Sequence, residues 1–202
     1  MKQLFFVFAF FSIYFSFSQN LHKEFLDKTI VELKKDSKID SKDFRAYDLL
    51  ESFYNEVLQS DNGELTEETS KKIEAYIVKD KIPNNHLLVL FLMYQEHITQ
   101  ALQNNERTNS EYQVACVNLL ENEINAIYSK IPALIYIHKF EALSANDNEA
   151  ESKRVLFEGV KKYPNSIPLK VYFYLSSGDI SLKKDLIENH KNHWMIKQFE
   201  IK

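Results

Sequence analysis

Two histidines near the C-terminus, His190 and His193, have a spacing that could serve metal binding on a helix. They stand three positions apart, so both would lie on one helix face, with Glu188 and Glu200 as the nearby acids. Zinc needs three or four converging ligands in tetrahedral geometry. The segment is rich in Lys and Asn, which is typical of a solvated surface. We therefore predict no metal site at this pair.

The segment Ser60–Leu65 resembles the middle of a calcium-binding EF-hand loop, with Gly63 at its sharp turn. Calcium needs oxygen ligands at the first and twelfth positions of such a loop. In this frame those positions are Leu58, which offers no side-chain oxygen, and Thr69, which offers no bidentate carboxylate. We therefore expect an ordinary turn between two helices.

The single cysteine, Cys116, lies one position before Val117 on an apolar stripe, which indicates a small core residue. A reactive thiol needs an electropositive, partly exposed setting, and the nearby Glu111, Glu121 and Glu123 favour the opposite. One cysteine also excludes an intramolecular disulfide framework and a zinc site built from several cysteines.

Motifs and composition argue against further classes of enzyme and binding partner. The 202 residues contain no Gly-x-Ser-x-Gly elbow, phosphate-binding loop or dinucleotide fingerprint, and only 3 glycines. With 25 Lys and Arg against 29 Asp and Glu, the net charge is −4 and no basic block is present, so nucleic acid is not an expected partner. We predict no catalytic residue and no cofactor. Carboxylates that meet only in space leave an enzyme of unrecognised type as an alternative.

The elements that must position these residues are helices. From residue 20 onward, apolar residues recur at intervals of three and four, and no stretch alternates long enough to predict a sheet. Ser41 and Thr66 are suitable N-caps. The pattern predicts an all-α fold with about nine helices joined by short turns. Turn signals that separate them are Asp61-Asn62-Gly63, Pro83-Asn84-Asn85, Asn146-Asp147-Asn148 and Tyr163-Pro164-Asn165.

The run Leu87–Tyr94 is apolar on all sides, which predicts a central helix covered by its neighbours. Such a segment could instead line a cavity, which keeps open a second class of function, a carrier of a small apolar ligand in the helical core.

One unit, at about 133–166, resembles a tetratricopeptide repeat. Counting back from Pro164 as the closing proline, Gly159 and Ser152 stand where that family has small residues, and Leu156 stands where it has a large apolar one. The unit covers about 34 residues and does not recur along the chain. The resemblance implies an irregular α-solenoid of stacked helix pairs with a concave protein- or peptide-binding surface and no catalysis.

The repeat frame predicts one feature of packing, and helical spacing further along the chain predicts one of binding. Gly159 should lie against the preceding helix near Phe140 or Leu143, because a small residue allows close approach. After Pro168, Lys170 and Tyr174 are four apart and share one side of a short aromatic helix, where a partner could bind. Alternatively, the last two helices cover that helix, with Trp194 filling the gap.

The first 18 residues read as an export signal. Lys2 supplies a positive start, Leu4–Phe17 is an uncharged stretch of 14 residues, and Ser16-Phe17-Ser18 offers small residues at a cleavage site. A bilayer-spanning helix needs roughly 20 apolar residues, so a permanent anchor is the less favoured alternative. No cysteine near the cut could carry a lipid.

We thus expect a signal peptide over 1–18 and a single helical domain over 19–202, with no membrane-spanning helix in the mature chain. The Phe-rich signal is similar to those of Gram-negative bacteria with AT-rich genomes. This similarity predicts a periplasmic or secreted protein. The predicted function is non-catalytic: an interaction protein that holds a protein or peptide of the envelope.

Export should remove the signal peptide. We predict that the exported protein begins at Gln19 or within two residues of it, because signal peptidase cleaves after small residues. Intact mass spectrometry of the exported protein measures this directly. A chain that retains Met1 and fractionates with membranes would contradict the prediction.

Overall fold

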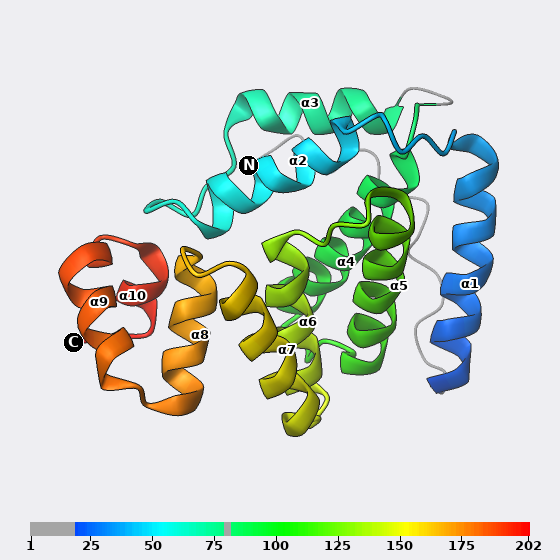
Figure 1. The fold of residues 1–202 in the computed structure, drawn as a ribbon. Coiled ribbons are helices and arrows are strands. Elements are labelled where there is room, and N and C mark those ends of the chain that lie inside the picture. The colour runs from blue at the N-terminus through cyan, green and yellow to red at the C-terminus, as the bar shows by residue number, and fades with distance from the viewer. Residues whose placement is uncertain (1–18, 79–81) are drawn as a thin grey trace.

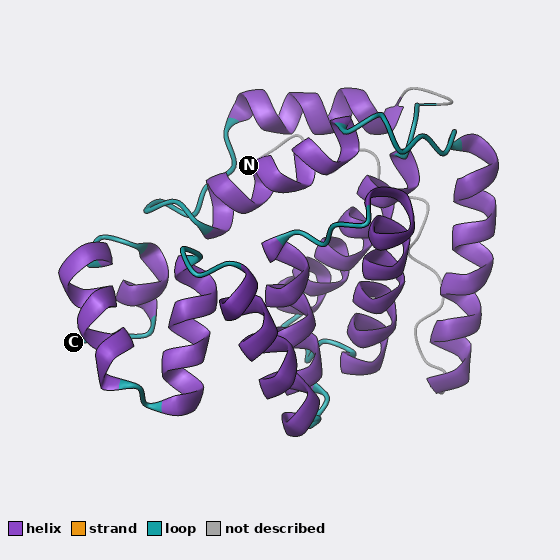
Figure 2. Ribbon diagram, viewed as in Figure 1, coloured by secondary structure: helices purple, strands orange, loops and turns teal. Residues whose placement is uncertain are grey.

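The computed structural model describes residues 19–78 and 82–202, and over these ranges it contains ten α-helices, one π-helical turn and no strand (Figures 1 and 2). The all-α prediction is confirmed, with ten helices in place of about nine. The predicted signal peptide, 1–18, lies outside the described residues. The elements are α1 (Gln19–Asp36), α2 (Arg45–Phe53), η2 (Tyr54–Leu58), α3 (Glu67–Val78), α4 (Asn85–Gln103), α5 (Ser110–Tyr128), α6 (Ala133–Ala145), α7 (Glu149–Lys162), α8 (Ile167–Ser177), α9 (Ile180–His190) and α10 (Trp194–Gln198).

Consecutive helices from α4 to α9 pack side by side, and the most extensive contacts join α6 to α7 and α5 to α6. Helix α1 packs on α5 and α4 at one end of this row. Helices α2 and α3 contact each other and α4, and η2 contacts α6. In Figure 1 the α2–α3 layer lies above the row, across the upper ends of its helices. In the described ranges, no helix is long and apolar enough to cross a membrane.

Helix α4 is central, as its all-round apolar run predicts. The side chains of Leu87, Leu88, Leu90 and Phe91 are fully buried, and Tyr94 joins them in the larger of two apolar clusters. Neighbouring helices cover α4 on several sides, so the residues of the Leu87–Tyr94 run contribute to the protein core.

The start of α2 differs from the prediction that Ser41 caps it. The helix begins at Arg45, where the Asp43 carboxylate accepts a hydrogen bond from the Arg45 N–H at 3.1 Å. By contrast, the predicted cap at Thr66 is confirmed, because its hydroxyl accepts from the N–H of Thr69 at 3.2 Å. The turn before α2 is instead held by a residue from elsewhere in the chain, Asn84.

Asn84 is buried with a left-handed backbone, φ 60°, just before α4. Its amide group donates to the carbonyls of Asp40 and Asp43 at 2.7 and 3.0 Å, and its side-chain oxygen accepts from the Asp40 N–H at 3.0 Å. The Tyr128 hydroxyl, at the end of α5, also bonds to the Asn84 amide and to the Asp43 carbonyl. One side chain therefore joins three parts of the fold.

The carbonyl groups at the end of η2 accept hydrogen bonds from residues near the C-terminus of the chain. Trp194 donates its indole N–H to the Val57 carbonyl at 3.0 Å, and His193 Nε2 lies 2.9 Å from the Leu58 carbonyl. Because His193 Nδ1 accepts from the Met195 N–H, Nε2 is the protonated nitrogen of this ring. We call His193, Trp194 and Gln59 the clasp.

Gln59 completes the clasp. Its side-chain oxygen accepts from the Tyr54 hydroxyl and from the Ile167 N–H, both at 2.9 Å, and its amide group donates to the Asn165 carbonyl at 3.1 Å. The clasp thus attaches the turn before α8 and the start of α10 to η2. A second apolar cluster joins α8, α9, α10 and the residues after them: Ile167, Val171, Leu186, Met195, Ile196 and Ile201.

Gly159 on α7 packs against the preceding helix, as the repeat resemblance predicts, but the neighbouring residue is different. A Cβ atom at Gly159 would lie 2.9 Å from Tyr136 Cβ and 3.1 Å from a methyl group of Leu169. The predicted neighbours, Phe140 and Leu143, lie about one and two helical turns further along α6 than Tyr136, so that part of the prediction is wrong. Ser152, the other small position, is also buried.

Replacing Gly159 with alanine should therefore destabilise the protein, although alanine is the better helix former. The added methyl group overlaps Tyr136 Cβ, which is anchored to backbone, and overpacking of this kind costs about 1–3 kcal/mol. Urea unfolding of Gly159→Ala measures the loss, with Lys161→Ala, at an exposed position of the same helix, as the control. An unchanged or raised unfolding free energy for Gly159→Ala would contradict close packing.

Candidate functional site

Four polar side chains from three helices form a hydrogen-bonded row, which we call the inner band: Gln95, His138, Glu141 and Tyr172. The Gln95 amide nitrogen lies 3.1 Å from His138 Nε2, and His138 Nδ1 lies 2.9 Å from one carboxylate oxygen of Glu141. The Tyr172 hydroxyl donates to the other Glu141 oxygen at 2.5 Å. The row crosses from α4 through α6 to α8.

The bond pattern assigns the imidazole tautomer. If the Gln95 amide donates to Nε2, then Nδ1 carries the proton and donates to Glu141. The ring of His138 lies on Tyr94 with centroids 5.0 Å apart, which holds its orientation. Burial, followed by the charge of Glu141, raises the pKa of Tyr172, so this hydroxyl stays a donor.

Glu141 is partly exposed to solvent, as are Gln95 and Tyr172 of the inner band. Its side chain is 32 % exposed, and one of its oxygens lies within hydrogen-bond distance of His138 Nδ1. A carboxylate has about four lone-pair sites, of which the internal bonds use two, so the group can accept further donors. Phe199, which is 37 % exposed, places its ring 6.1 Å from that of Tyr172 and borders the band. The arrangement suits a cationic group held by a carboxylate beside aromatic rings.

A second constellation has the residue types of an acyl-transfer triad. Ser37 Oγ lies 3.0 Å from His86 Nδ1, and His86 Nε2 lies 3.5 Å from a Glu123 oxygen. Lys34 of α1 pairs with Glu123 at 2.6 Å. Ser37 directly follows α1, His86 lies in the first turn of α4 and Glu123 lies in the C-terminal half of α5.

The surroundings of this constellation favour a structural role. Ser37 and His86 are buried, and Ser37 follows the C-terminal end of α1, where a helix presents carbonyl oxygens. An acyl-transfer site needs N–H donors for a developing oxyanion. Burial outweighs the attraction of Glu123 and lowers the pKa of His86 to about 4, so the imidazole is neutral at pH 7.

The two residues predicted to bind a partner, Lys170 and Tyr174, lie where α8 faces α9. Lys170 pairs with Asp185 of α9 at 2.6 Å and lowers the pKa of that carboxyl group. Tyr174 is half-buried against the second apolar cluster. Helices α9 and α10 both contact α8, and Trp194 packs between the two clusters, as the covering alternative describes. Binding through Lys170 and Tyr174 stays a prediction.

The remaining candidates have structural partners. His193 uses both ring nitrogens in hydrogen bonds, and no group of three or more His, Cys, Asp or Glu side chains within 19–78 and 82–202 could hold a metal. Gly63 forms the predicted sharp turn, φ 68°, directly against the Trp194 ring. Cys116 is buried as predicted, and burial raises the pKa of its thiol to about 12.

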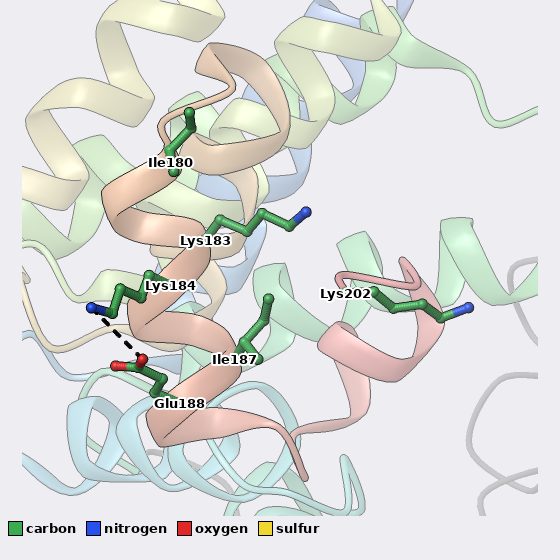
Figure 3. Close-up of a pocket in the computed structure, with 6 residues that line it drawn as sticks. All are labelled: Ile180, Lys183, Lys184, Ile187, Glu188 and Lys202. Carbon is green, nitrogen blue, oxygen red and sulfur yellow. Dashed lines mark ion pairs between the residues drawn. The ribbon is translucent and has the colours of Figure 1, made fainter.

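A shallow depression of about 270 Å³ lies on the outer face of α9 (Figure 3). Five of its residues belong to α9 and one follows α10, and in Figure 3 Lys183 and Ile187 lie on the side of α9 that faces Lys202. We call this surface the α9 depression. It is lined by Ile180, Lys183, Lys184, Ile187, Glu188 and Lys202.

Sequence reasoning missed both the inner band and the α9 depression. His138 and Glu141 are three apart and would share a helix face, which is the one local signal of the inner band. Their partners Gln95 and Tyr172 lie more than 30 positions away along the chain, and spacing does not reveal such pairs.

The buried, neutral His86 should make the protein less stable as the pH falls. The unfolded chain binds a proton near pH 6.5, whereas the folded protein binds it only near pH 4. The unfolding free energy is therefore lost between these values, by about 1–2 kcal/mol from pH 7 to pH 5. Urea unfolding of the wild type and His86→Gln at both pH values isolates this contribution, since other histidines are common to both. Equal losses in the two proteins would contradict it.

Comparison with protein-family models, with curated proteins and with solved structures finds no match for this chain. Its function is therefore inferred from the arrangement of its own residues.

Proposed function

We propose that the chain is an exported, non-catalytic interaction protein of the bacterial envelope, which holds a protein or peptide partner on a surface built by stacked helix pairs. Export is supported by the sequence of residues 1–18, and the stacked arrangement by the repeat-like unit at about 133–166. The buried small residues Gly159 and Ser152, together with side-by-side packing from α4 to α9, agree with such a unit.

The observation that carries the proposal is the inner band. The alternate helices α4, α6 and α8 each contribute side chains to it, as the first helices of stacked pairs do when they line a concave face. Tyr172 and His138 hold the Glu141 carboxylate in position, so little rotamer freedom is lost when a partner binds.

The chemistry of the inner band favours a basic side chain in the partner. A Lys or Arg of the bound segment would donate to the open lone pairs of Glu141, while its stem packs on Tyr172 and Phe199. Charge-assisted hydrogen bonds of this type contribute about 1.5–3 kcal/mol.

Site-specific photo-crosslinking in the exporting cell tests this function. A photoreactive phenylalanine analogue at Phe199 should give a defined adduct with one envelope protein. The same analogue at Phe157, which is 58 % exposed on α7, should not. Glu141→Gln should lower the yield of the Phe199 adduct about tenfold, in line with the loss of about 1.4 kcal/mol of binding.

Glu64→Gln is the matched control, because it removes one exposed carboxylate elsewhere and should leave the yield unchanged. Equal adducts from Phe199 and Phe157 would contradict binding at the inner band. A co-purified apolar molecule in native mass spectra, without a protein adduct, would favour the carrier alternative.

A further inference from the structure

The α9 depression contains two isoleucines that differ in exposure: Ile180 is largely exposed, whereas Ile187 is partly buried and also packs against the second apolar cluster. Ile180 and Ile187 are seven positions apart, which is close to two helical turns, so they lie in one line about 10 Å long. Leu186, on another side of the helix, is fully buried against the second apolar cluster. Ile180 is 81 % exposed. Thus α9 buries one face and presents a short apolar line on the other.

Three lysines border this line, and their charges are weakly compensated. Lys183 has no carboxylate within 4.0 Å among the described residues. Lys184 pairs with Glu188, and Lys202 with Glu200, each at 3.8 Å and largely in solvent. Exposed pairs of this kind contribute little. The α9 depression therefore brings together three ammonium groups, with the carboxylates of Glu188 in its lining and Glu200 beside Lys202 as their weak partners, and leaves Lys183 uncompensated.

The positive charge is local to this end of the molecule. Residues 151–202 contain ten Lys and Arg against six Asp and Glu, although the whole chain has a net charge of −4. A negatively charged partner is therefore repelled by most of the protein and attracted to its C-terminal quarter, which favours one orientation of approach.

The dimensions favour a protein segment over a small molecule. The depression holds about 270 Å³ and is open to solvent, while small-molecule pockets hold about 300–1,000 Å³ and bury most of the ligand. An apolar floor between positive charges fits one or two aliphatic side chains flanked by carboxylates.

We infer that the α9 depression is a docking site for an acidic segment of a partner protein, with aliphatic side chains placed between Ile180 and Ile187 and carboxylates beside Lys183 and Lys202. This site has the opposite charge preference to the inner band and does not depend on the function proposed for that band. Its affinity should fall as salt rises, because the contacts are exposed.

Fluorescence anisotropy with a labelled synthetic peptide tests the inference. The probe alternates glutamate and leucine, and two peptides of equal length serve as references, one of glutamate alone and one of lysine and leucine. The wild type should bind the glutamate–leucine probe at least about tenfold more tightly than either reference, since both the charge and the apolar line contribute.

Paired charge reversals localise the binding. Lys183→Glu with Lys202→Glu should weaken binding about tenfold or more, and Ile180→Asn should weaken it several-fold. Lys23→Glu with Lys42→Glu changes net charge equally at exposed lysines elsewhere and should stay within about twofold of wild type. Circular dichroism checks that each variant is folded.

Three outcomes would overturn the inference: no binding of the probe by the folded wild type, equal weakening by both charge reversals, or equal binding of the glutamate-only peptide. A further arm uses vesicles of anionic phosphatidylglycerol. Binding to vesicles without binding of the probe would assign the surface to a membrane and would also overturn the inference.

Discussion

The last carbonyl groups of η2 need hydrogen-bond donors, and the position of the C-terminal helices depends on how these are supplied. A helix end leaves carbonyl groups without hydrogen-bond partners, and each buried carbonyl that stays without one lowers the stability by about 1–3 kcal/mol. Here the donors belong to His193 and Trp194, 135 and 137 positions from their acceptors. Gln59, next along the chain, binds the turn before α8 in the same region. Helix α8 also packs on α7 and α6, so these few long-range bonds add a second attachment, which fixes the C-terminal helices against the end of η2.

The helices themselves were predictable because their signals are local. Three-and-four apolar spacing repeats within each helix, and prolines, glycines and asparagines mark the turns. The central position of α4 follows from the run Leu87–Tyr94, which has no polar face. The burial of Cys116 follows from its place on an apolar stripe of α5. Gly159 was correctly predicted to touch the preceding helix, since a helical glycine is costly unless something packs closely on it. The residue that contacts Gly159 was wrongly predicted, because the offset of two packed helices along their axes depends on all the side chains between them.

The candidate site was much less predictable, for a physical reason. Glu141 becomes distinctive only when Tyr172 bonds to it and Gln95 bonds to its neighbour His138, and both contacts depend on how α4, α6 and α8 are offset. The start of α2 shows the same dependence, because Asn84, from beyond α3, occupies the carbonyls of the turn where Ser41 was expected to act as a cap. Likewise, spacing along α8 placed Lys170 and Tyr174 on one side but did not identify Asp185 as the neighbour of Lys170.

The chain contains one tryptophan, and its location gives the protein a built-in optical probe. The Trp194 ring lies against Gly63, packs between the two apolar clusters and bonds through its N–H to the end of η2. Its emission should therefore respond when the C-terminal helices leave the rest of the molecule. Far-ultraviolet circular dichroism follows all ten helices together. Divergence between the two signals would distinguish release of the C-terminal helices from loss of the whole fold, without any added label.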